Sequence, residues 1–312
     1  ARPAAELARR LGAKPFFADT NTLYSGSRSN AVDHLETATA HGFVPEVAGA
    51  PVLIADGLKS DDLREVPLPG SCTRFAKAKI ANGFIAADSM IVLTHVKGHE
   101  MAGFGGAIKN LAMGCAPAVG KRDQHCVKFQ VKDDKCIACG RCVAVCPTGA
   151  ATIPKSKGTK AVIDKETCIG CGECLAHCSP KAITMDWDVG LVEFTEKMTE
   201  YALGAVQGKS GRVLYLSVVT KVVPLCDCAP WSDMPVVPDI GYLAGTDPVA
   251  IDQAAVDLVR AAPVWPGSML DGKAGPGDDK FTAMHPKTKG DLQLSHGERI
   301  GLGSREYELV RL

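Results

Sequence analysis

The sequence has no excess of charge of either sign, because 35 Lys and Arg residues balance 35 Asp and Glu residues over 312 residues. Nucleic acids and anionic membrane surfaces attract proteins with a basic patch or stripe, so this balance argues against both as partners. Long hydrophobic runs are also missing. Apolar stretches such as residues 213–220 are far shorter than the roughly 18 residues that span a bilayer. We therefore expect a soluble protein without a membrane span.

An export signal is missing as well, since no apolar core follows Arg9 and Arg10 near the amino end. This predicts a cytoplasmic protein. The chain begins with Ala rather than Met, and we expect that its amino end is truncated. Hydrophobic residues make up 46% and charged residues 22% of the chain, which is the usage of a globular protein rather than a disordered one. The length predicts about two domains.

Cysteine is the residue type in excess. The chain has 13, and eight of them fall between Cys136 and Cys178. The segment that starts at Cys136 is repeated 32 residues later from Cys168, with nine identities in eighteen aligned positions and no gap. Both copies have the spacing C-x2-C-x2-C-x3-C, in which three thiolates bind one iron–sulfur cluster and the fourth binds the cluster of the other copy.

This spacing predicts two interleaved quartets of cluster ligands. The first is Cys136, Cys139, Cys142 and Cys178, and the second is Cys168, Cys171, Cys174 and Cys146. Zinc sites more often use two separated C-x2-C pairs, and disulfides need an oxidising compartment, so both alternatives are weaker. Gly140 and Gly172 suit loops in which backbone amides approach a cluster closely.

On these motifs, residues 129–187 resemble the bacterial two-cluster ferredoxins. The resemblance implies two [4Fe-4S] clusters in a small pseudo-symmetric α+β fold that passes single electrons at low potential. Pro147 follows the fourth cysteine as in that family, whereas Ser179 precedes Pro180 in the second copy. We therefore predict a ferredoxin-like insert over residues 129–190, between residues 1–128 and 191–312 of one α/β domain.

The flanking segments alternate short β-rich runs with helical patterns, which predicts a parallel-rich sheet with crossover helices. We expect a helix through Leu7 and Leu11 and strands near residues 15–18, 52–55, 90–94 and 212–219. The second and third of these are expected to be buried strands. Asn30 is expected to cap a helix that ends at Gly42, and Asp247 one that begins at Pro248.

The stretch from Thr94 to Gly114 runs from a strand end, through Gly103, Gly105 and Gly106, into an expected helix. Amides at a helix start bind anions when glycines allow close approach, and Lys109 would add a positive charge, so a cofactor could bind here. The alternative is a glycine-rich turn that only packs tightly. No G-x-G-x-x-G fingerprint is present, which argues against direct nicotinamide binding.

The whole chain resembles domain-of-unknown-function family 362, whose members are described as iron–sulfur centre proteins. Three segments carry the likeness, namely residues 19–36, residues 95–114, and residues 226–241 together with 246–252.

A more distant likeness to the nickel-pincer lactate racemases lies in the pattern from His99 through Gly103 to Lys109. It implies that His99 and His125 could bind a metal or cofactor and that Lys109 could anchor it. Asn21 stands where that family has a catalytic His, and Asn cannot exchange protons near neutral pH, which argues against racemase chemistry.

Two further sets of residues are candidates. Asp19 and Asn21 follow a strand end, where open α/β sheets place ligand-binding residues, although turn or capping roles fit them equally well. Cys226 and Cys228, with Cys126 and His125, could form a third metal site. A reduced pair of thiols in a loop is the alternative.

We therefore expect an iron–sulfur oxidoreductase in an anaerobic cytoplasm. Its clusters would carry electrons between a redox partner, either a protein or a small-molecule carrier, and a site around His99, Lys109 and His125. A non-enzymatic electron carrier and a racemase-like isomerase with structural clusters are the alternatives. The substrate is not readable from the sequence.

Overall fold

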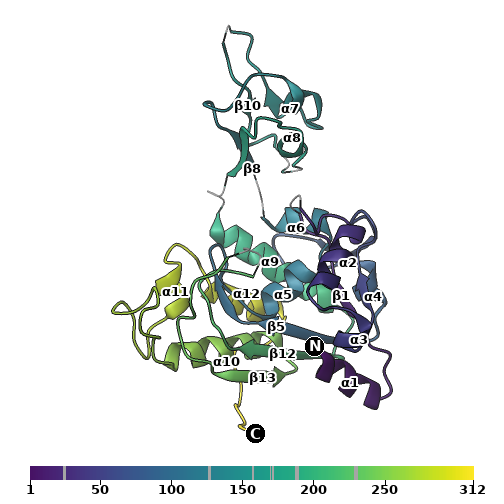
Figure 1. Ribbon diagram of the computed structural model, residues 1–312, viewed down its shortest axis with the longest axis vertical. Coiled ribbons are helices and arrows are strands. Elements are labelled where there is room, and N and C mark those ends of the chain that lie inside the picture. Colours follow the sequence, from purple (N-terminus) through teal and green to yellow (C-terminus); the bar gives the residue numbers. More distant parts are fainter. Residues whose placement is uncertain are drawn as a thin grey trace. The chain divides into compact units, whose positions relative to one another are not determined.

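The computed structural model describes residues 1–23, 26–125, 128–156, 158–168, 170, 172–186, 190–227 and 231–312. The chain forms two compact units (Figure 1). The first consists of Ala1–Lys121 together with Leu191–Leu312, and the second is Arg122–Gly190. We call them the α/β unit and the cysteine-rich unit.

A three-stranded sheet forms the centre of the α/β unit, in the order β13 (Gly241–Gly245), β12 (Val213–Val219) and β5 (Met90–His95). Strand β12 is parallel to β5 and antiparallel to β13. Helix α5 (Ala107–Gly114) packs on β5, and helix α10 (Pro248–Ala261) packs on β12 and β13. Behind them lie α9 (Leu191–Val206) and α12 (Asp291–Ile300), which contact each other.

The two faces of this sheet are buried to different degrees. Val213, Tyr215, Ser217 and Val219 of β12 are buried, whereas Leu214, Leu216 and Val218 are only partly buried. On β5, Ile91 is 37% and Leu93 is 38% exposed. The prediction of a buried strand therefore holds for one face of β5 only, where Val92 and Thr94 are buried, and no residue of β2 (Val52–Ile54) is buried. The reason is that a strand with one covered face alternates in burial, while an apolar run alone does not reveal which faces are covered.

The remaining strands of this unit form pairs. Strand β1 (Phe17–Asp19) is parallel to β2, while β3 (Leu63–Pro67) with β4 (Lys77–Ala81), and β6 (Lys97–His99) with β7 (Gly103–Gly105), are antiparallel. A mixed α/β fold is thus observed, but its strands form several small sheets rather than one parallel-rich sheet. The shorter helices are α1 (Arg2–Arg10), α2 (Ala31–Ala40), α3 (Pro45–Ala48), α4 (Asn82–Ala86), α6 (Ala118–His125) and α11 (Lys280–Met284).

The predicted helix caps are confirmed. The Asn30 side chain accepts hydrogen bonds from the amides of Val32 and Asp33, each at 3.1 Å. The Asp247 carboxylate accepts from the amides of Val249 and Ala250 at 2.8 and 3.0 Å. Each side chain satisfies amides that lack a partner in the first helical turn, which is why local sequence suffices to predict them.

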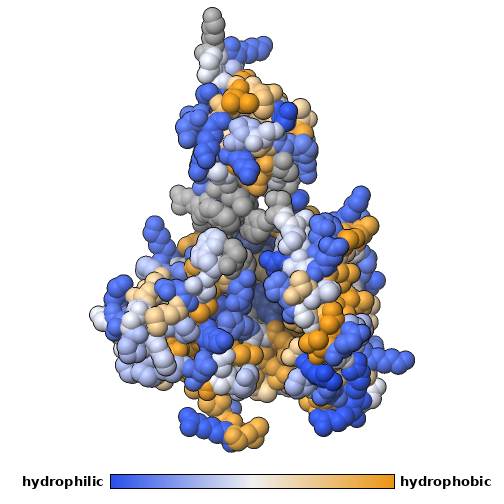
Figure 2. Space-filling model, in the orientation of Figure 1, coloured by the Kyte–Doolittle hydropathy of each residue, from blue (hydrophilic) through white to orange (hydrophobic). Residues whose placement is uncertain are grey.

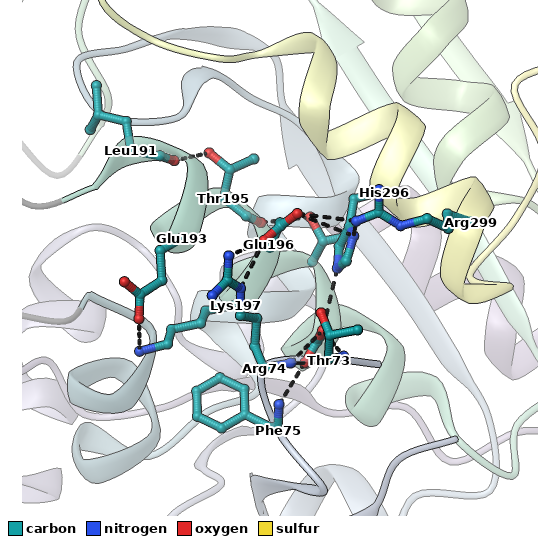
Figure 3. A network of polar contacts seen from close by, with 12 residues as sticks. Thr73, Arg74, Phe75, Leu191, Glu193, Thr195, Glu196, Lys197, His296 and Arg299 are labelled. Atoms are coloured by element: carbon teal, nitrogen blue, oxygen red, sulfur yellow. Dashed lines mark hydrogen bonds and ion pairs between the residues drawn. The ribbon is translucent and has the colours of Figure 1, made fainter. Parts of the chain in front are cut away.

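A polar network around two buried carboxylates ties α9 to α12 and to residues 73–75 (Figure 3). Glu196 forms ion pairs with Arg74 at 2.6 Å and with Arg299 at 3.1 Å. One turn later, the fully buried Glu200 lies 3.4 Å from His296. Both carboxylates face side chains or amides that can donate to them, as buried charges require.

The cysteine-rich unit has a twofold repeat in its pairing. Strand β8 (Lys128–Val131) pairs with β11 (Ile183–Asp186), and β10 (Val162–Ile163) pairs with β9 (Ala151–Thr152). The first strand of each sequence copy therefore pairs with the last strand of the other. Helices α7 (Arg141–Ala144) and α8 (Glu173–Ala176) lie 32 residues apart and contact each other.

Backbone conformations and hydrogen bonds follow the same 32-residue repeat. Positive φ angles occur at Ala138 and Gly170, at Gly140 and Gly172, and at Gly149 and Lys181. The Lys128 ammonium donates to the carbonyl of Cys168 at 2.6 Å, and the Lys160 ammonium donates to that of Cys136 at 2.7 Å. The duplication is thus present in the structure as well as in the sequence.

The surface of the cysteine-rich unit is mixed. Figure 2 shows hydrophobic residues beside hydrophilic ones on its visible face, and its exposed apolar side chains include Ile137 and Val162. A small unit cannot bury all of its apolar area, so such exposure is expected. Within the described ranges of the chain, every helix is too short or too polar to cross a membrane.

Candidate functional site

Four cysteines line one cavity in the cysteine-rich unit. They are Cys136, Cys139, Cys142 and Cys178, and the cavity has an empty volume of about 330 Å³. The first three come from one sequence copy, before and within α7, while Cys178 follows α8 in the other copy. Cys178 is brought to this cavity because β11, which follows it, pairs with β8 of the first copy.

A second cavity, of about 290 Å³, is lined by Cys146, Cys168 and Cys174. Here Cys146 comes from the first copy and the other two come from the second. Cys171, which the sequence assigns to the same quartet, lies outside the described residues. The walls of both cavities are otherwise mostly apolar and include Phe129, Ile163 and Ile183.

Backbone amides point at several of these sulfurs. The amides of Ala138, Ala151 and Ala182 donate to the sulfurs of Cys136, Cys146 and Cys178 at 3.4, 3.4 and 3.2 Å. Burial opposes ionisation of Cys146, but backbone amides, including that of Ala151, outweigh it and lower the pKa of its thiol. Burial raises the pKa of the Cys142 thiol.

This donor set fits a cluster better than a single metal ion. Among the residues that the structure describes, no three His, Cys, Asp or Glu side chains converge closely enough to hold one ion. Four thiolates around one zinc each lie about 2.3 Å from the metal, which demands such convergence. In a [4Fe-4S] cluster each thiolate binds a different iron, so four sulfurs that surround a cavity suit it.

The glycine-rich segment of the α/β unit is not an open anion site. The amides of Ala107 and Ile108 at the start of α5 donate to the buried carboxylate of Asp252 at 2.6 and 2.9 Å. The amides that we expected to bind an anion therefore already donate to a carboxylate of the protein itself. Burial raises the pKa of Asp252 to about 7, although these two amides oppose the shift.

Close packing accounts for the three glycines proposed as cofactor-binding residues. A Cβ atom at Gly106 would lie 2.4 Å from an Asp252 oxygen, and one at Gly103 would lie 2.8 Å from the Cα of Gly290. Gly103 also has a φ of 82°. A Cβ atom at Gly105 would lie 3.3 and 3.5 Å from the side chains of Lys97 and Lys109. The tightly packed turn, our alternative, describes this segment better.

Two of the predicted catalytic residues do lie together. The Lys109 ammonium is 3.7 Å from the sulfur of Cys226, and His99 forms a side-chain hydrogen bond with the same cysteine. His99 and Cys226 are buried. The hairpin of β6 and β7 positions His99, α5 positions Lys109, and the loop after β12 positions Cys226. From the sequence we assigned Cys226 to a different site. The spacing of the residues around it does not reveal that side chains more than a hundred positions away contact it in the fold.

A neighbouring ion-pair cluster holds the loop that carries Cys226. Asp227 lies 3.0 Å from both His95 and Lys97. Although burial opposes the shift, His95 and Lys97 lower the pKa of Asp227 to about 2. The same hydrogen bond raises the pKa of His95. The loop therefore carries an ionised Asp227 at neutral pH.

Asn21 and Asp19 belong to a polar cluster at the ends of β1 and β2. The Asn21 amide group donates to Asp56 at 3.1 Å and to the carbonyl of Gly57 at 2.9 Å. Asp19 accepts from the Thr20 amide at 2.8 Å. The contacts of Asn21 connect the two strand ends and that of Asp19 is with the next residue, so both favour the structural alternative.

Lys121, which the sequence did not single out, is buried in the same cluster. Its ammonium donates to Thr20 Oγ1, to the Asn21 carbonyl and to the Ala116 carbonyl, at 2.5, 2.6 and 2.9 Å. Burial lowers its pKa to about 8, and Asp19 and Asp56 oppose the shift. A lysine in a helical segment gives no sequence signal for such burial.

The residues proposed for a third metal site belong to different units or lie outside the described residues. His125 is buried and belongs to the cysteine-rich unit, whereas Cys226 belongs to the α/β unit. Cys126 and Cys228 lie outside the described residues.

Comparison with protein families gives a match over most of the chain. The family described as "Domain of unknown function (DUF362)" matches residues 1–257, which is most of the chain and includes the cysteine-rich unit. A search of the curated proteins finds no match. The match spans both units and the cluster around Cys226, and the chain therefore belongs to the DUF362 family.

Proposed function

We propose that the cysteine-rich unit is a ferredoxin-like domain, inserted in the α/β unit, that binds two [4Fe-4S] clusters and transfers single electrons. The observation that carries the proposal is the cavity lined by four cysteines from both sequence copies, Cys136, Cys139, Cys142 and Cys178. Cys146 reaches the second cavity in the reciprocal way. Such an exchange of the fourth ligand is the arrangement that the C-x2-C-x2-C-x3-C spacing requires.

When bound, the clusters would supply reversible one-electron chemistry. The protein would hold the thiolates between mostly apolar walls and would stabilise negative charge on sulfur through the amides of Ala138, Ala151 and Ala182. Such hydrogen bonds raise the potential of a site relative to one without them, since they favour the form with more negative charge. Lys128 and Lys160 fix the backbone at Cys168 and Cys136.

We further propose that the protein is an oxidoreductase, with the α/β unit as the part that acts on a small molecule. The cluster of buried His99, half-buried Lys109 and buried Cys226 supports this reading over a pure electron carrier, because a carrier has no need for a lysine and a histidine that contact one cysteine. The isomerase alternative gains no support, since Asn21 holds Asp56 and Gly57.

Iron and sulfide analysis of protein purified without oxygen tests the clusters. We expect about eight iron atoms per chain and a paramagnetic signal on reduction with dithionite. Cys178→Ser and Cys146→Ser should each remove about four of these iron atoms. Cys72→Ser is the matched control, because Cys72 lies in the other unit and should leave the iron content unchanged.

Double variants test the exchange of ligands. If Cys136 and Cys178 bind the same cluster, the variant with both changed to Ser should keep about four iron atoms. The variant with Cys136 and Cys146 changed should lose both clusters. The opposite pattern would show that each copy holds its own cluster. Colourless protein, or zinc in place of iron, would refute the proposal as a whole.

A further inference from the structure

The two ends of the cysteine-rich unit can be compared position by position. The segments at the first cavity, residues 131–142 and 178–183, correspond through the 32-residue repeat to residues 163–174 and 146–151 at the second cavity. Positive φ angles recur at equivalent positions in both copies. Because both ends have the same cysteine spacing, a difference in side-chain charge between them is not required for holding a cluster.

The charges of the two ends are opposite in sign. The segments at the first cavity carry four positive side chains, Lys132, Lys135, Arg141 and Lys181, and two negative ones, Asp133 and Asp134, a net charge of +2. Those at the second cavity carry one positive side chain, Lys165, and three negative ones, Asp164, Glu166 and Glu173, a net charge of −2. All ten side chains are exposed, so a molecule that approaches from solvent meets them directly.

The wall of the first cavity also reaches the surface. Ile137 and Cys139 line this cavity, yet Ile137 is 67% exposed and Cys139 is exposed as well. A cluster in the cavity would therefore lie directly behind an exposed part of the chain. Protein interfaces have an apolar centre and a polar rim, and Ile137, which stands between Lys135 and Arg141 in the sequence, gives this surface both elements.

The chain enters and leaves the strand pair of β8 and β11 at the opposite end. Strand β8 begins at Lys128 and β11 ends at Asp186, and these two residues pair with each other. Phe129, which follows Lys128, lines the second cavity. Val131 and Ile183 form the other end of the strand pair and line the first cavity. Both chain connections therefore join the strand pair on the side of the second cavity.

We propose that the exposed surface at the first cavity, formed by Lys132, Lys135, Ile137, Arg141 and Lys181, is the docking site for an acidic redox protein. The inference rests on the proposed function, since the partner exchanges electrons with a cluster in this cavity. The net charge of +2 attracts an acidic partner and the net charge of −2 at the second cavity repels it, so the partner is directed to one end. In each exchange one electron passes between the partner's cofactor and the cluster, one being oxidised as the other is reduced, and no bond forms or breaks.

Binding of an acidic flavodoxin, a protein whose flavin exchanges single electrons, tests this docking site. The full-length protein with its clusters and the flavodoxin are both kept oxidised, so that calorimetry measures association without electron transfer. Lys132→Glu combined with Lys135→Glu should increase Kd at least about tenfold at an ionic strength of about 0.1 M. At about 1 M, where the Debye length is about 3 Å, the variant and the original protein should differ by less than about twofold.

The matched control is Lys14→Glu combined with Lys59→Glu. It makes the same change in net charge, but on exposed side chains of the α/β unit. Because the Debye length is about 10 Å at 0.1 M, we expect the control to change Kd by less than about threefold. Carbodiimide joins a lysine amine directly to a carboxylate, and its cross-links to flavodoxin should lie at Lys132, Lys135 and Lys181.

Three outcomes would overturn the docking site. They are equal binding by the two double variants, cross-links at Lys165 or in the α/β unit instead, and no binding of flavodoxin by the original protein, which would favour a small-molecule carrier. Both variants should keep about eight iron atoms, since neither changes a cysteine. Failure of docking with the iron intact therefore concerns the surface alone, whereas an original protein without iron would refute the cluster proposal.

Discussion

Glu200 offers the sharpest test of how the α/β unit is held together. Its carboxylate is fully buried on α9 and accepts hydrogen bonds from the amides of Thr73 at 2.8 Å, Arg74 at 3.0 Å and Phe75 at 2.8 Å. His296 of α12 lies on its other side, 3.4 Å away. The Glu200 side chain therefore holds residues 73–75 and α12 against α9, the helix with which the α/β unit resumes at Leu191.

Glu200→Gln removes the charge and replaces one oxygen with a nitrogen that cannot accept. At least one of the three amides then loses its partner, at about 1–3 kcal/mol for a buried donor, and the remaining bonds lose their charge assistance. We expect a loss of about 2–4 kcal/mol in the free energy of unfolding. This corresponds to a decrease in Tm of roughly 5–15 °C, since about 2–4 °C is lost per kcal/mol in units of this size.

Urea denaturation followed by circular dichroism measures the loss, with Glu193→Gln as the control. Glu193 lies on the same helix and pairs with Lys197 at 2.8 Å, but its side chain is 45% exposed. Such exposed pairs contribute only about 0.3–0.5 kcal/mol. Equal stability of the two variants would refute the assignment of Glu200 as the anchor of residues 73–75.

The pH dependence of stability gives an independent check. Burial alone would raise the pKa of Glu200, but His296 and the three amides lower it below its usual value. The unfolded state therefore takes up a proton before the folded state does as pH falls. The stabilisation is present above the unfolded pKa and is lost as pH falls through the folded one. Glu200→Gln should accordingly lose less stability on acidification than the original protein.

Three further substitutions test other contacts. Burial lowers the pKa of Lys121 from 10.5 to about 8. As pH rises between these two values, the unfolded state keeps a proton that the folded state has released, so the original protein should gain stability relative to Lys121→Met. Urea titrations at each pH measure this gain. Gly106→Ala should lower Tm because its Cβ would lie 2.4 Å from Asp252, whereas Gly70→Ala, with nothing within 4 Å, should not. Asp247→Ala should cost about 1–2 kcal/mol through the lost cap of α10, and an unchanged denaturation midpoint would contradict this.

Local features of the fold were predictable because they depend on a few neighbouring residues. The caps at Asn30 and Asp247 and the helix end at Gly42, whose φ is 83°, follow from side-chain and backbone chemistry within one turn. The burial of β2 and β5 was not predictable, because it depends on which sheet face the helices cover. The hairpin of β6 and β7 was missed for a related reason, since Gly98 and Gly105 read as loop residues.

At the candidate sites, too, local features were predictable and contacts between distant residues were not. Gly106 suggested an open anion-binding loop, but a carboxylate 146 positions along the chain fills the space that its missing side chain leaves. Lys109 and His99 were identified together through the likeness to the nickel-pincer lactate racemases, yet their common partner Cys226 was not.

The amino-acid sequence by itself determined the repeat, the spacing of its cysteines and the helix ends, because each is a relation between residues close in the chain. Only the tertiary structure decided that Cys178 lines a cavity with Cys136, that Asp252 occupies the start of α5, and that Lys109 and His99 meet Cys226. These contacts join segments far apart in sequence, and their existence depends on strand pairing and helix packing that no local pattern specifies.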